Sequence, residues 1–435
     1  MATARSEARA ALDGDRDAVR HLAASVLKPL NDNFVERPWG GMRMLGYKAL
    51  TGIAVRDGFG LGEAFELAAD DSDAEARAHP SRIRCADGSE LSLPELLARH
   101  ADALLGSDFV RRYGARLPLL PKTLDVAELL SVQGHPPGNT EIYVIIDAEP
   151  GATIRLGFNR DIDAAAFAER LTQGRREQQA LLALCRTDVD THALQRTIAP
   201  WLAQRAVPAA TLESALAPLL EPNVRFAEVA RILTVLHDVY WEVLDSMNEI
   251  PVAAGQVIHN ANPPRIVAAS GRPVSAEVHA LGNPQGRELL ALEIRRPGPT
   301  LRAWDNVRFP LREIDVRAAL GALNLRRTEP HELIAARSAV PNRPGVSVSV
   351  DSEYFRLEHL EPDLKRGVDV PAEPPHTLHA IAGRALLRSV ATGAVLAELN
   401  RGESALVPLG VGAYRVSAAV PATHIVKVTF PNGDS

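Results

Sequence analysis

The chain has 435 residues, of which 46% are hydrophobic and 23% charged, and its formal net charge is −6. This length predicts two or three domains, and the absence of a basic stripe argues against nucleic acid as a partner. Cys85 and Cys185 are too few for a disulfide framework or a cysteine metal site, and no apolar run reaches the roughly 18 residues that a membrane span needs. With no signal-like N-terminus, we expect a cytoplasmic protein without membrane contact.

Helix and strand signals alternate in the first third of the chain. Apolar residues at helical spacing predict a helix within residues 8–30, and a second helix is expected at 93–105. Short strands are expected at 42–45 and 61–67. The β-branched run 142–146 predicts a further strand.

After Gly157 the apolar period changes from two residues to about 3.6, which indicates a helical domain. Asp163 and Thr211 are each expected to cap a helix. The longest helix is expected at 224–247, where one apolar stripe is typical of core packing.

From Pro251 onward the pattern is again that of short antiparallel strands, as in a barrel. A connector is expected at 330–344. The expected strands are 274–281, 288–294, 300–304, 378–390, 394–399, 404–407, 414–419 and 424–430. The sequence therefore predicts a mainly β fold with an α-helical insert.

The segment 131–141 gathers three possible metal ligands, Gln133, His135 and Glu141. Gln133 and His135 are two residues apart, so on a strand their side chains project from one face. Pro136, Pro137 and Gly138 then predict a turn that returns Glu141 to the same cavity. An amide oxygen, an imidazole nitrogen and a carboxylate suit a divalent ion of the zinc type, with room for a fourth ligand.

Seven motifs, in order along the chain, resemble those of the type I phosphomannose isomerases, zinc-dependent sugar isomerases of the cupin superfamily. They are 38–41 (PWGG), 62–67 (GEAFEL), 117–122 (LPLLPK), 130–136 (LSVQGHP), 277–282 (EVHALG), 292–294 (LEI) with 301–305 (LRAWD), and 401–408 (RGESALVP). The resemblance implies two cupin (jelly-roll) barrels in tandem plus a helical domain. The implied division is a catalytic domain of 1–160 with 246–328, a helical domain of 161–245 and a C-terminal cupin-like domain of 329–435.

The resemblance further implies one Zn²⁺ per chain, held by Gln133, His135, Glu141 and His279. His259 is a rival for the fourth ligand. The implied reaction interconverts mannose 6-phosphate and fructose 6-phosphate or a close analogue, in a monomer or homodimer.

Other side chains are implied at the sugar phosphate. Lys122 and Arg302 are candidates for both catalysis and substrate binding, and Glu293 is a candidate for proton transfer. The remaining substrate-binding candidates are Ser131, Arg308 and Trp39. For the two arginines a surface ion pair with Asp305 or Glu313 is the alternative, and for Trp39 it is core packing.

The sequence departs from the family pattern around the metal. Asn139 stands where the family usually has lysine, the loop between His135 and Glu141 is shorter, and the segment 256–279 is longer, with a Pro- and Gly-rich insert at 262–275. Asparagine supplies no positive charge and no exchangeable proton near neutral pH. Two alternatives therefore stand beside the isomerase: a metalloenzyme of the same family acting on another, possibly non-phosphorylated, carbohydrate-like substrate, and a non-catalytic sugar-binding relative.

Overall fold

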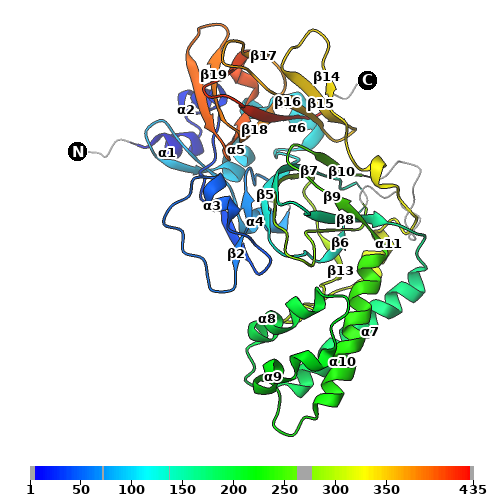
Figure 1. The fold of residues 1–435 in the computed structure, drawn as a ribbon. Helices are drawn as coiled ribbons and strands as arrows, with labels where there is room; N and C mark the ends of the chain where they lie inside the picture. Colours follow the sequence, from blue (N-terminus) through cyan, green and yellow to red (C-terminus); the bar gives the residue numbers. More distant parts are fainter. Residues whose placement is uncertain (1–4, 71–72, 137, 262–276, 432–435) are drawn as a thin grey trace.

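The structure is a computed structural model, and it describes residues 5–70, 73–136, 138–261 and 277–431. Figure 1 shows three layers along the long axis of the molecule: helices at one end, two central sheets, and a second pair of sheets formed by the C-terminal part. We propose that these layers correspond to the predicted division into 161–245, 1–160 with 246–328, and 329–435. Within the described part of the chain, no helix is both long enough and apolar enough to cross a membrane.

Two antiparallel sheets form the central layer. The order of the first is β1-β2-β5-β12-β7-β10, and that of the second is β13-β6-β11-β8-β9. The first sheet consists of β1 (Phe34–Arg37), β2 (Gly60–Phe65), β5 (Leu120–Val126), β12 (Leu289–Arg295), β7 (Glu141–Ala148) and β10 (Val257–Asn260). The second consists of β13 (Leu301–Trp304), β6 (Val132–Gly134), β11 (His279–Leu281), β8 (Thr153–Phe158) and β9 (Met247–Pro251).

Strand β12 lies in the middle of the first sheet and every residue of it is buried. It pairs with β5 on one side and with β7 on the other, so Glu293 lies opposite both Lys122 and Tyr143. Apolar side chains of both sheets, including Tyr143, Ile154 and Leu281, share one core cluster. The polar side chains of the site are therefore fixed between strands with buried apolar neighbours.

The helical layer is inserted between β8 and β9. Its elements are α7 (Ala164–Leu184), α8 (Thr191–Leu202), η1 (Ala209–Leu212), α9 (Glu213–Leu216), η2 (Ala217–Leu219) and α10 (Phe226–Asp245). Asp163 caps α7 as expected, because its carboxylate accepts the N–H of Ala166 at 2.8 Å. The expected cap at Thr211 is wrong: Thr211 lies inside the 3₁₀ helix η1, and its hydroxyl donates to the carbonyl of Pro208.

The C-terminal layer is a pair of antiparallel sheets, with orders β14-β15-β16-β23-β18-β21 and β17-β22-β19-β20. An apolar cluster with Leu378, Val416 and Ile425 lies between them. The strands are β14 (Ser338–Ala339), β15 (Val346–Asp351), β16 (Arg356–Leu360), β17 (Val368–Val370), β18 (His376–Ala382), β19 (Arg384–Ser389), β20 (Val395–Asn400), β21 (Ser404–Val407), β22 (Tyr414–Ala418) and β23 (His424–Thr429). The described strands thus form two layers of paired antiparallel sheets, and none of these sheets closes on itself. Paired sheets are compatible with jelly rolls, but two closed barrels in tandem stay a prediction.

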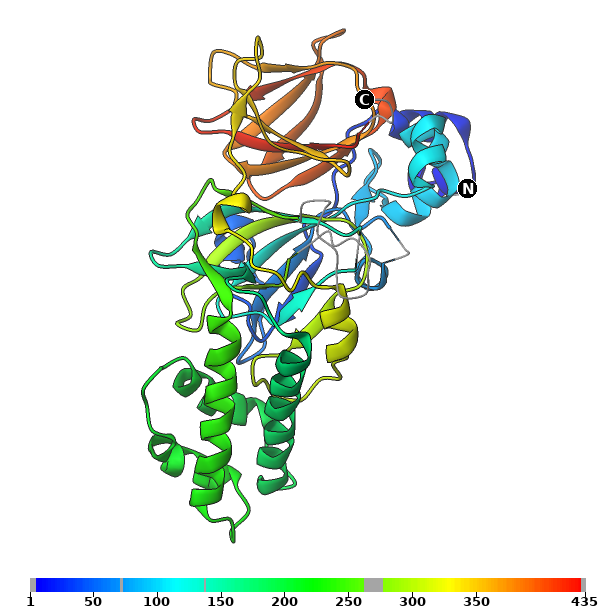
Figure 2. The ribbon, with the colours of Figure 1, turned by 90° about the vertical axis from the view of Figure 1, so that its right-hand side faces the viewer.

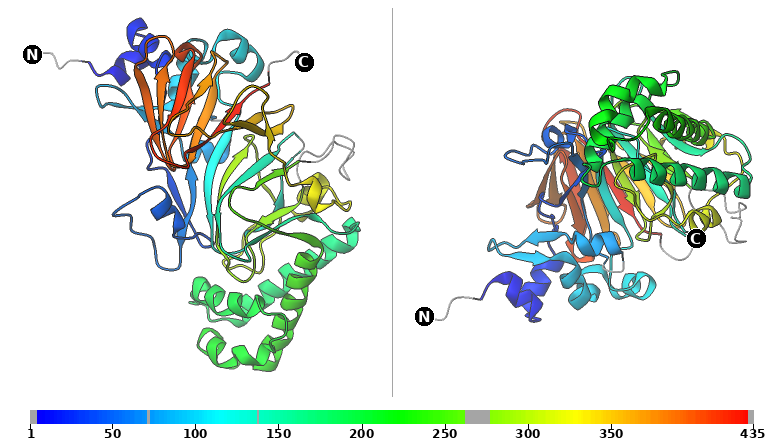
Figure 3. Two further views of the ribbon diagram at one scale, coloured as in Figure 1. Left: turned by 45° about the horizontal axis from the view of Figure 1, so that its top comes forward. Right: turned by 90° about the horizontal axis from the view of Figure 1, so that it is seen from below.

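The N-terminal helices pack beside the C-terminal layer, as Figure 2 and the left view of Figure 3 show. Leu27 forms a β-bridge with Leu406, and both lie in one core cluster that also takes residues from the central sheets. The remaining elements are α1 (Glu7–Leu12), α2 (Arg16–Ala23), α3 (Arg43–Tyr47), α4 (Ala74–Ala78), β3 (Arg82–Arg84), β4 (Glu90–Ser92), α5 (Leu93–Leu105), α6 (Ser107–Tyr113), α11 (Val316–Ala322), η3 (Pro330–Glu332) and η4 (Leu409–Val411).

Several expected elements are corrected. The expected strand at 42–45 lies mostly in helix α3, where the N–H of Met44 donates to Asp125 Oδ2 at 2.7 Å. Four residues, one of them Arg43, are too few to show whether the apolar period is that of a strand or of a helix. The segment 8–30, expected as one helix, contains two helices, α1 and α2, which are separated at Gly14. The segment 378–390, expected as one strand, contains two strands, β18 and β19, which are separated at Gly383. Both glycines have a positive φ. The insert 262–275 and the start of the strand 274–281 lie outside the described residues.

Candidate metal centre

Three buried side chains from three strand ends converge between the central sheets. His135 directly follows β6, Glu141 begins β7 and His279 begins β11, and each residue is 1% exposed. His135 Nε2 lies 2.5 Å from Glu141 Oε1, and His279 Nε2 lies 3.4 Å from Glu141 Oε2. One candidate ligand atom from each residue lies within 4.8 Å of the others. This arrangement suits three ligands of one divalent ion.

Gln133 adds a fourth donor. It pairs with His279 in the β6–β11 register, and its Nε2 lies 3.2 Å from His279 Nε2. Its Oε1 accepts the hydroxyl of Ser131 at 2.9 Å. A half-turn of the amide exchanges its oxygen and nitrogen, so Gln133 can present an oxygen to an ion that His279 also binds.

The surroundings of the two imidazoles fit a cation. His135 Nδ1 lies 3.1 Å from the carbonyl oxygen of Pro299, and His279 Nδ1 lies 3.0 Å from that of Glu277. An Nδ1–H donated to a backbone carbonyl leaves the Nε2 lone pair free for a metal. His135 Nε2 and Glu141 Oε1 are buried and have no polar partner except each other, and a bound cation would be shared by both.

The protonation states also suit metal binding. Burial alone would raise the pKa of Glu141, but the charges of His135 and His279 and a hydrogen bond from Tyr143 hold that pKa well below its ordinary range. Burial lowers the pKa of His279 despite the neighbouring carboxylate. Near neutral pH the site therefore offers a carboxylate and a neutral imidazole, the forms that bind metal.

Two residues around Glu141 were missed in the sequence. The hydroxyl of Tyr143 donates to Glu141 Oε2, and Asn260 Nδ2 donates to the same oxygen at 3.2 Å. Tyr143 is two residues from Glu141 on one strand, so the period of two could have indicated it. Asn260 lies opposite Glu141 in the β7–β10 pair, and only strand pairing reveals that contact.

Lys122 is not a surface lysine but part of a buried ionic cluster. Only 3% of the residue is exposed, and its Nζ lies 3.2 Å from Glu63 Oε1 and 2.6 Å from Glu75 Oε2. Arg295, 2% exposed, lies 3.2 Å from Glu75 Oε2 and 3.5 Å from Asp73 Oδ2. Burial acts to lower the pKa of Lys122, but these carboxylates outweigh it and raise that pKa, so the lysine stays cationic. Arg37 also donates to Glu63, so three carboxylates balance three cations in this cluster.

Glu293 lies between Lys122 and Tyr143 on the adjacent strands of the first sheet. It is 7% exposed, and burial raises its pKa to about 7 although Lys122 opposes the shift. A carboxyl with this pKa both accepts and donates a proton near neutral pH.

Arg302 and Ser131 lie beside Gln133. Arg302 is opposite Gln133 in the β6–β13 pair, and its Nε is buried without a hydrogen-bond partner. Burial and the charge of Arg312 lower the pKa of Arg302, but it remains a cation near neutral pH. Arg302 is thus a cation at the metal-binding end of the sheets whose Nε is available to a ligand.

Three other predicted residues are placed elsewhere. Arg308 donates to the carbonyl of Leu129, lies 3.6 Å from Asp305 and lines a different cavity. Trp39 is 7% exposed and lies in the apolar core, which agrees with the core-packing alternative. His259 is half-buried with its pKa lowered to about 4 by desolvation, and it lies outside the group formed by His135, Glu141 and His279.

Comparisons with known proteins agree with this architecture. Residues 30–150 match the family model "phosphomannose isomerase type I, catalytic domain". Among solved structures, a candidate mannosephosphate isomerase from Archaeoglobus fulgidus is 18% identical, with 94% of this chain and 98% of that chain covered and a TM-score of 0.57. A mutant phosphomannose isomerase from Salmonella typhimurium is 17% identical, with 94% and 100% covered and a TM-score of 0.58. A mannose 6-phosphate isomerase bound with zinc and yttrium gives 16% identity, 94% and 100% coverage and a TM-score of 0.58. Among curated protein sequences, no match is found.

Proposed function

We propose that the chain is a zinc-dependent aldose–ketose isomerase and a divergent member of the type I phosphomannose isomerases. The match of residues 30–150 to the model of that family's catalytic domain supports this proposal. Its expected substrates are mannose 6-phosphate and fructose 6-phosphate or a close analogue. The observation that supports this most directly is the buried group of His135, Glu141 and His279 beside Glu293, whose pKa of about 7 suits proton transfer.

The metal would be held by Gln133, His135, Glu141 and His279. A divalent ion bound there would supply Lewis-acid stabilisation of negative charge on the sugar oxygens. Tyr143 and Asn260 hold the Glu141 carboxylate in place through its Oε2. The ligand set fits zinc because two nitrogen donors and two oxygen donors are present.

Different side chains are proposed to have different roles in the isomerisation. The reaction removes a proton from C2 of the aldose and returns one to C1, while a proton moves between the two oxygens. Glu293 is proposed to take and return the carbon-bound proton. Arg302 would stabilise the negative charge that develops on the substrate, and Ser131 would donate a hydrogen bond to it. Lys122, fixed by Glu63 and Glu75, is proposed to stay cationic and to position Glu293.

The test is a coupled assay of purified, zinc-loaded protein with both sugar phosphates. We expect interconversion that is lost after removal of the metal and in the variant His279→Asn, while His259→Asn keeps it. This pair is matched because both histidines lie in strands of the central sheets, His279 buried and His259 half-buried, but only His279 lies in the ligand group. Full metal loading without any interconversion of these sugars would refute the assignment.

A second candidate substrate class, a non-phosphorylated sugar, is favoured by the ionic cluster. Lys122 and Arg295, together with Arg37, are already paired with Glu63, Glu75 and Asp73, so a phosphate that bound to this cluster would have to displace one of these carboxylates. Asn139, at the position of the family's lysine, contributes no charge, and its Nδ2 donates to the carbonyl of Arg296 at 3.0 Å. Comparing kcat/KM for mannose and mannose 6-phosphate separates the two classes. A preference for the phosphorylated sugar of about a hundredfold or more would exclude this second candidate.

A further inference from the structure

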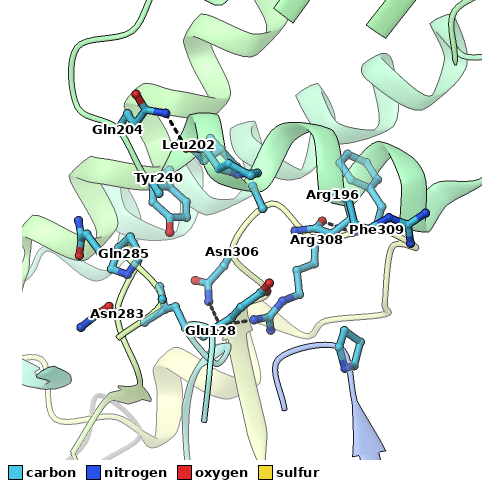
Figure 4. Close-up of a pocket in the computed structure, with 18 of the residues that line it drawn as sticks. Glu128, Arg196, Leu202, Gln204, Tyr240, Asn283, Gln285, Asn306, Arg308 and Phe309 are labelled. Carbon is cyan, nitrogen blue, oxygen red and sulfur yellow. Dashed lines mark hydrogen bonds between the residues drawn. The ribbon is translucent and has the colours of Figure 1, made fainter. Parts of the chain in front are cut away.

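A second cavity lies away from the metal ligands, between the helical layer and the central sheets. Its volume is about 680 Å³, within the range of small-molecule sites. Helix α8 and Tyr240 of α10 line one side, and the loops around Glu128, Asn283 and Asn306 line the other. In Figure 4 the side chains of Tyr240, Asn306 and Arg308 reach into the same space.

The cavity contains polar groups that the protein leaves without partners. Asn306 is 5% exposed, and its Oδ1 is buried without a hydrogen-bond partner although its Nδ2 donates to the carbonyl of Leu130. The Tyr240 hydroxyl makes no hydrogen bond with the described residues, nor does the carboxylate of Glu128 at the rim. Because a buried polar atom without a partner destabilises a fold, the acceptor of Asn306 indicates a ligand that donates a hydrogen bond to it.

The two arginines that line the cavity, Arg196 and Arg308, already lie near carboxylates, which disfavours an anionic ligand. Arg196 lies 3.6 Å from the carboxylate of Asp190. Arg308 is 7% exposed, and its guanidinium already donates to the carbonyl of Leu129 and lies 3.6 Å from the carboxylate of Asp305. The carboxylate of Glu128 adds a negative charge at the rim. The acceptors of Asn306 and Glu128 and the hydroxyl of Tyr240 match hydroxyl groups, which both donate and accept. The side-chain amides of Gln195 and Gln285, which also line the cavity, add groups of the same two kinds.

Apolar side chains line the remaining wall, among them Leu129, Leu202 and Phe309. A lone hexose would leave this wall without a partner, whereas an aromatic ring joined to a sugar would cover it. We propose that this cavity is a second binding site, for an uncharged sugar that carries an aromatic group. Asn306 and Arg308 connect it to Leu129 and Leu130, the residues that directly precede Ser131.

The probe for this site is 4-nitrophenyl β-D-glucopyranoside, titrated calorimetrically into the zinc-loaded full-length protein. We expect saturable binding that weakens about tenfold or more in Asn306→Gly, because one buried hydrogen bond is lost. Glycine keeps the positive φ of 54° at this position. Asn342→Gly is the matched control, since Asn342 also has a positive φ, 59°, but is exposed on the C-terminal sheets. It should bind as the wild type does.

Two further variants and one competition experiment keep the proposal testable if Asn306→Gly fails to fold. Ala199→Phe fills the cavity from α8 and should abolish binding, and Tyr240→Phe should weaken it. An excess of mannose 6-phosphate should leave the probe bound. The proposal is overturned if the wild type does not bind the probe, if Ala199→Phe binds it unchanged, or if mannose 6-phosphate displaces it.

Discussion

The ionisation of Glu293 should make the protein less stable as the pH rises. Its pKa is about 7 in the folded chain and near 4.5 for an ordinary glutamate. The folded state therefore binds more protons than the unfolded state between these values, so the free energy of unfolding falls as the pH rises from 4.5 towards 7. Once the carboxyl is fully ionised, this difference in pKa has lowered the free energy of unfolding by about 3 kcal/mol.

The variant Glu293→Gln removes this ionisation while keeping the size of the side chain. We expect the variant to gain stability relative to the wild type as the pH rises, by about 3 kcal/mol between pH 4.5 and pH 8. It should also lose isomerase activity, since an amide does not transfer the proton. The assay is urea unfolding of metal-free protein at several pH values, because a bound cation would change the charges near Glu293.

The control for this experiment is Glu353→Gln, which changes an exposed carboxyl in the turn between β15 and β16. Its stability difference from the wild type should be small and nearly independent of pH. If the curves for Glu293→Gln and the wild type stay parallel across the pH range, the buried carboxyl is not protonated near neutral pH. The proton-transfer role proposed for Glu293 would then lose its physical basis.

Three further predictions concern stability. Lys427→Met should lower the free energy of unfolding, measured with a chemical denaturant, by about 3–5 kcal/mol, because the ammonium of Lys427 is 1% exposed and pairs with two glutamates. Lys365→Met, at an exposed position, should change this free energy little. Equal effects of the two substitutions would contradict the buried pairing. Gly60→Ala should abolish soluble expression, because the added Cβ would lie 2.1 Å from a backbone oxygen. Gly46→Ala, at a helical position with space around it, should raise the free energy of unfolding by about 0.5–1 kcal/mol. Zinc should raise the melting temperature of the wild type but not of Glu141→Gln; an equal rise in both would place the ion elsewhere.

The local sequence was sufficient to predict those helices and strands whose apolar residues recur with a clear period. The helix at 93–105 and the strand at 404–407 are confirmed within the observed bounds of α5 and β21. The alternation at 61–67 likewise marks β2. The segment 42–45 is only four residues long, so the period of its apolar residues was undefined, and tertiary contacts of Met44 and Arg43 selected a helix.

Part of the candidate metal centre was likewise predictable from the local sequence, and part was not. Gln133, His135 and Glu141 are close in the chain and separated by a turn signal, so their convergence follows from the sequence and the structure places the two ionisable ligands 2.5 Å apart. His279 was reached only through the family resemblance, because 138 residues separate it from Glu141 and no local rule connects them. The pairing of β6 with β11 brings it to Gln133.

The charge balance of the site was decided by tertiary structure alone. The sequence shows that Lys122 can carry a positive charge, but it does not show that Glu63 of β2 and Glu75 of α4 pair with it. Strand order places Glu293 between Lys122 and Tyr143, and burial there gives it a pKa of about 7. A sequence specifies which side chains can bind a metal or move a proton. Their protonation and pairing depend on burial and on neighbours far along the chain, which exist only after the sheets have formed.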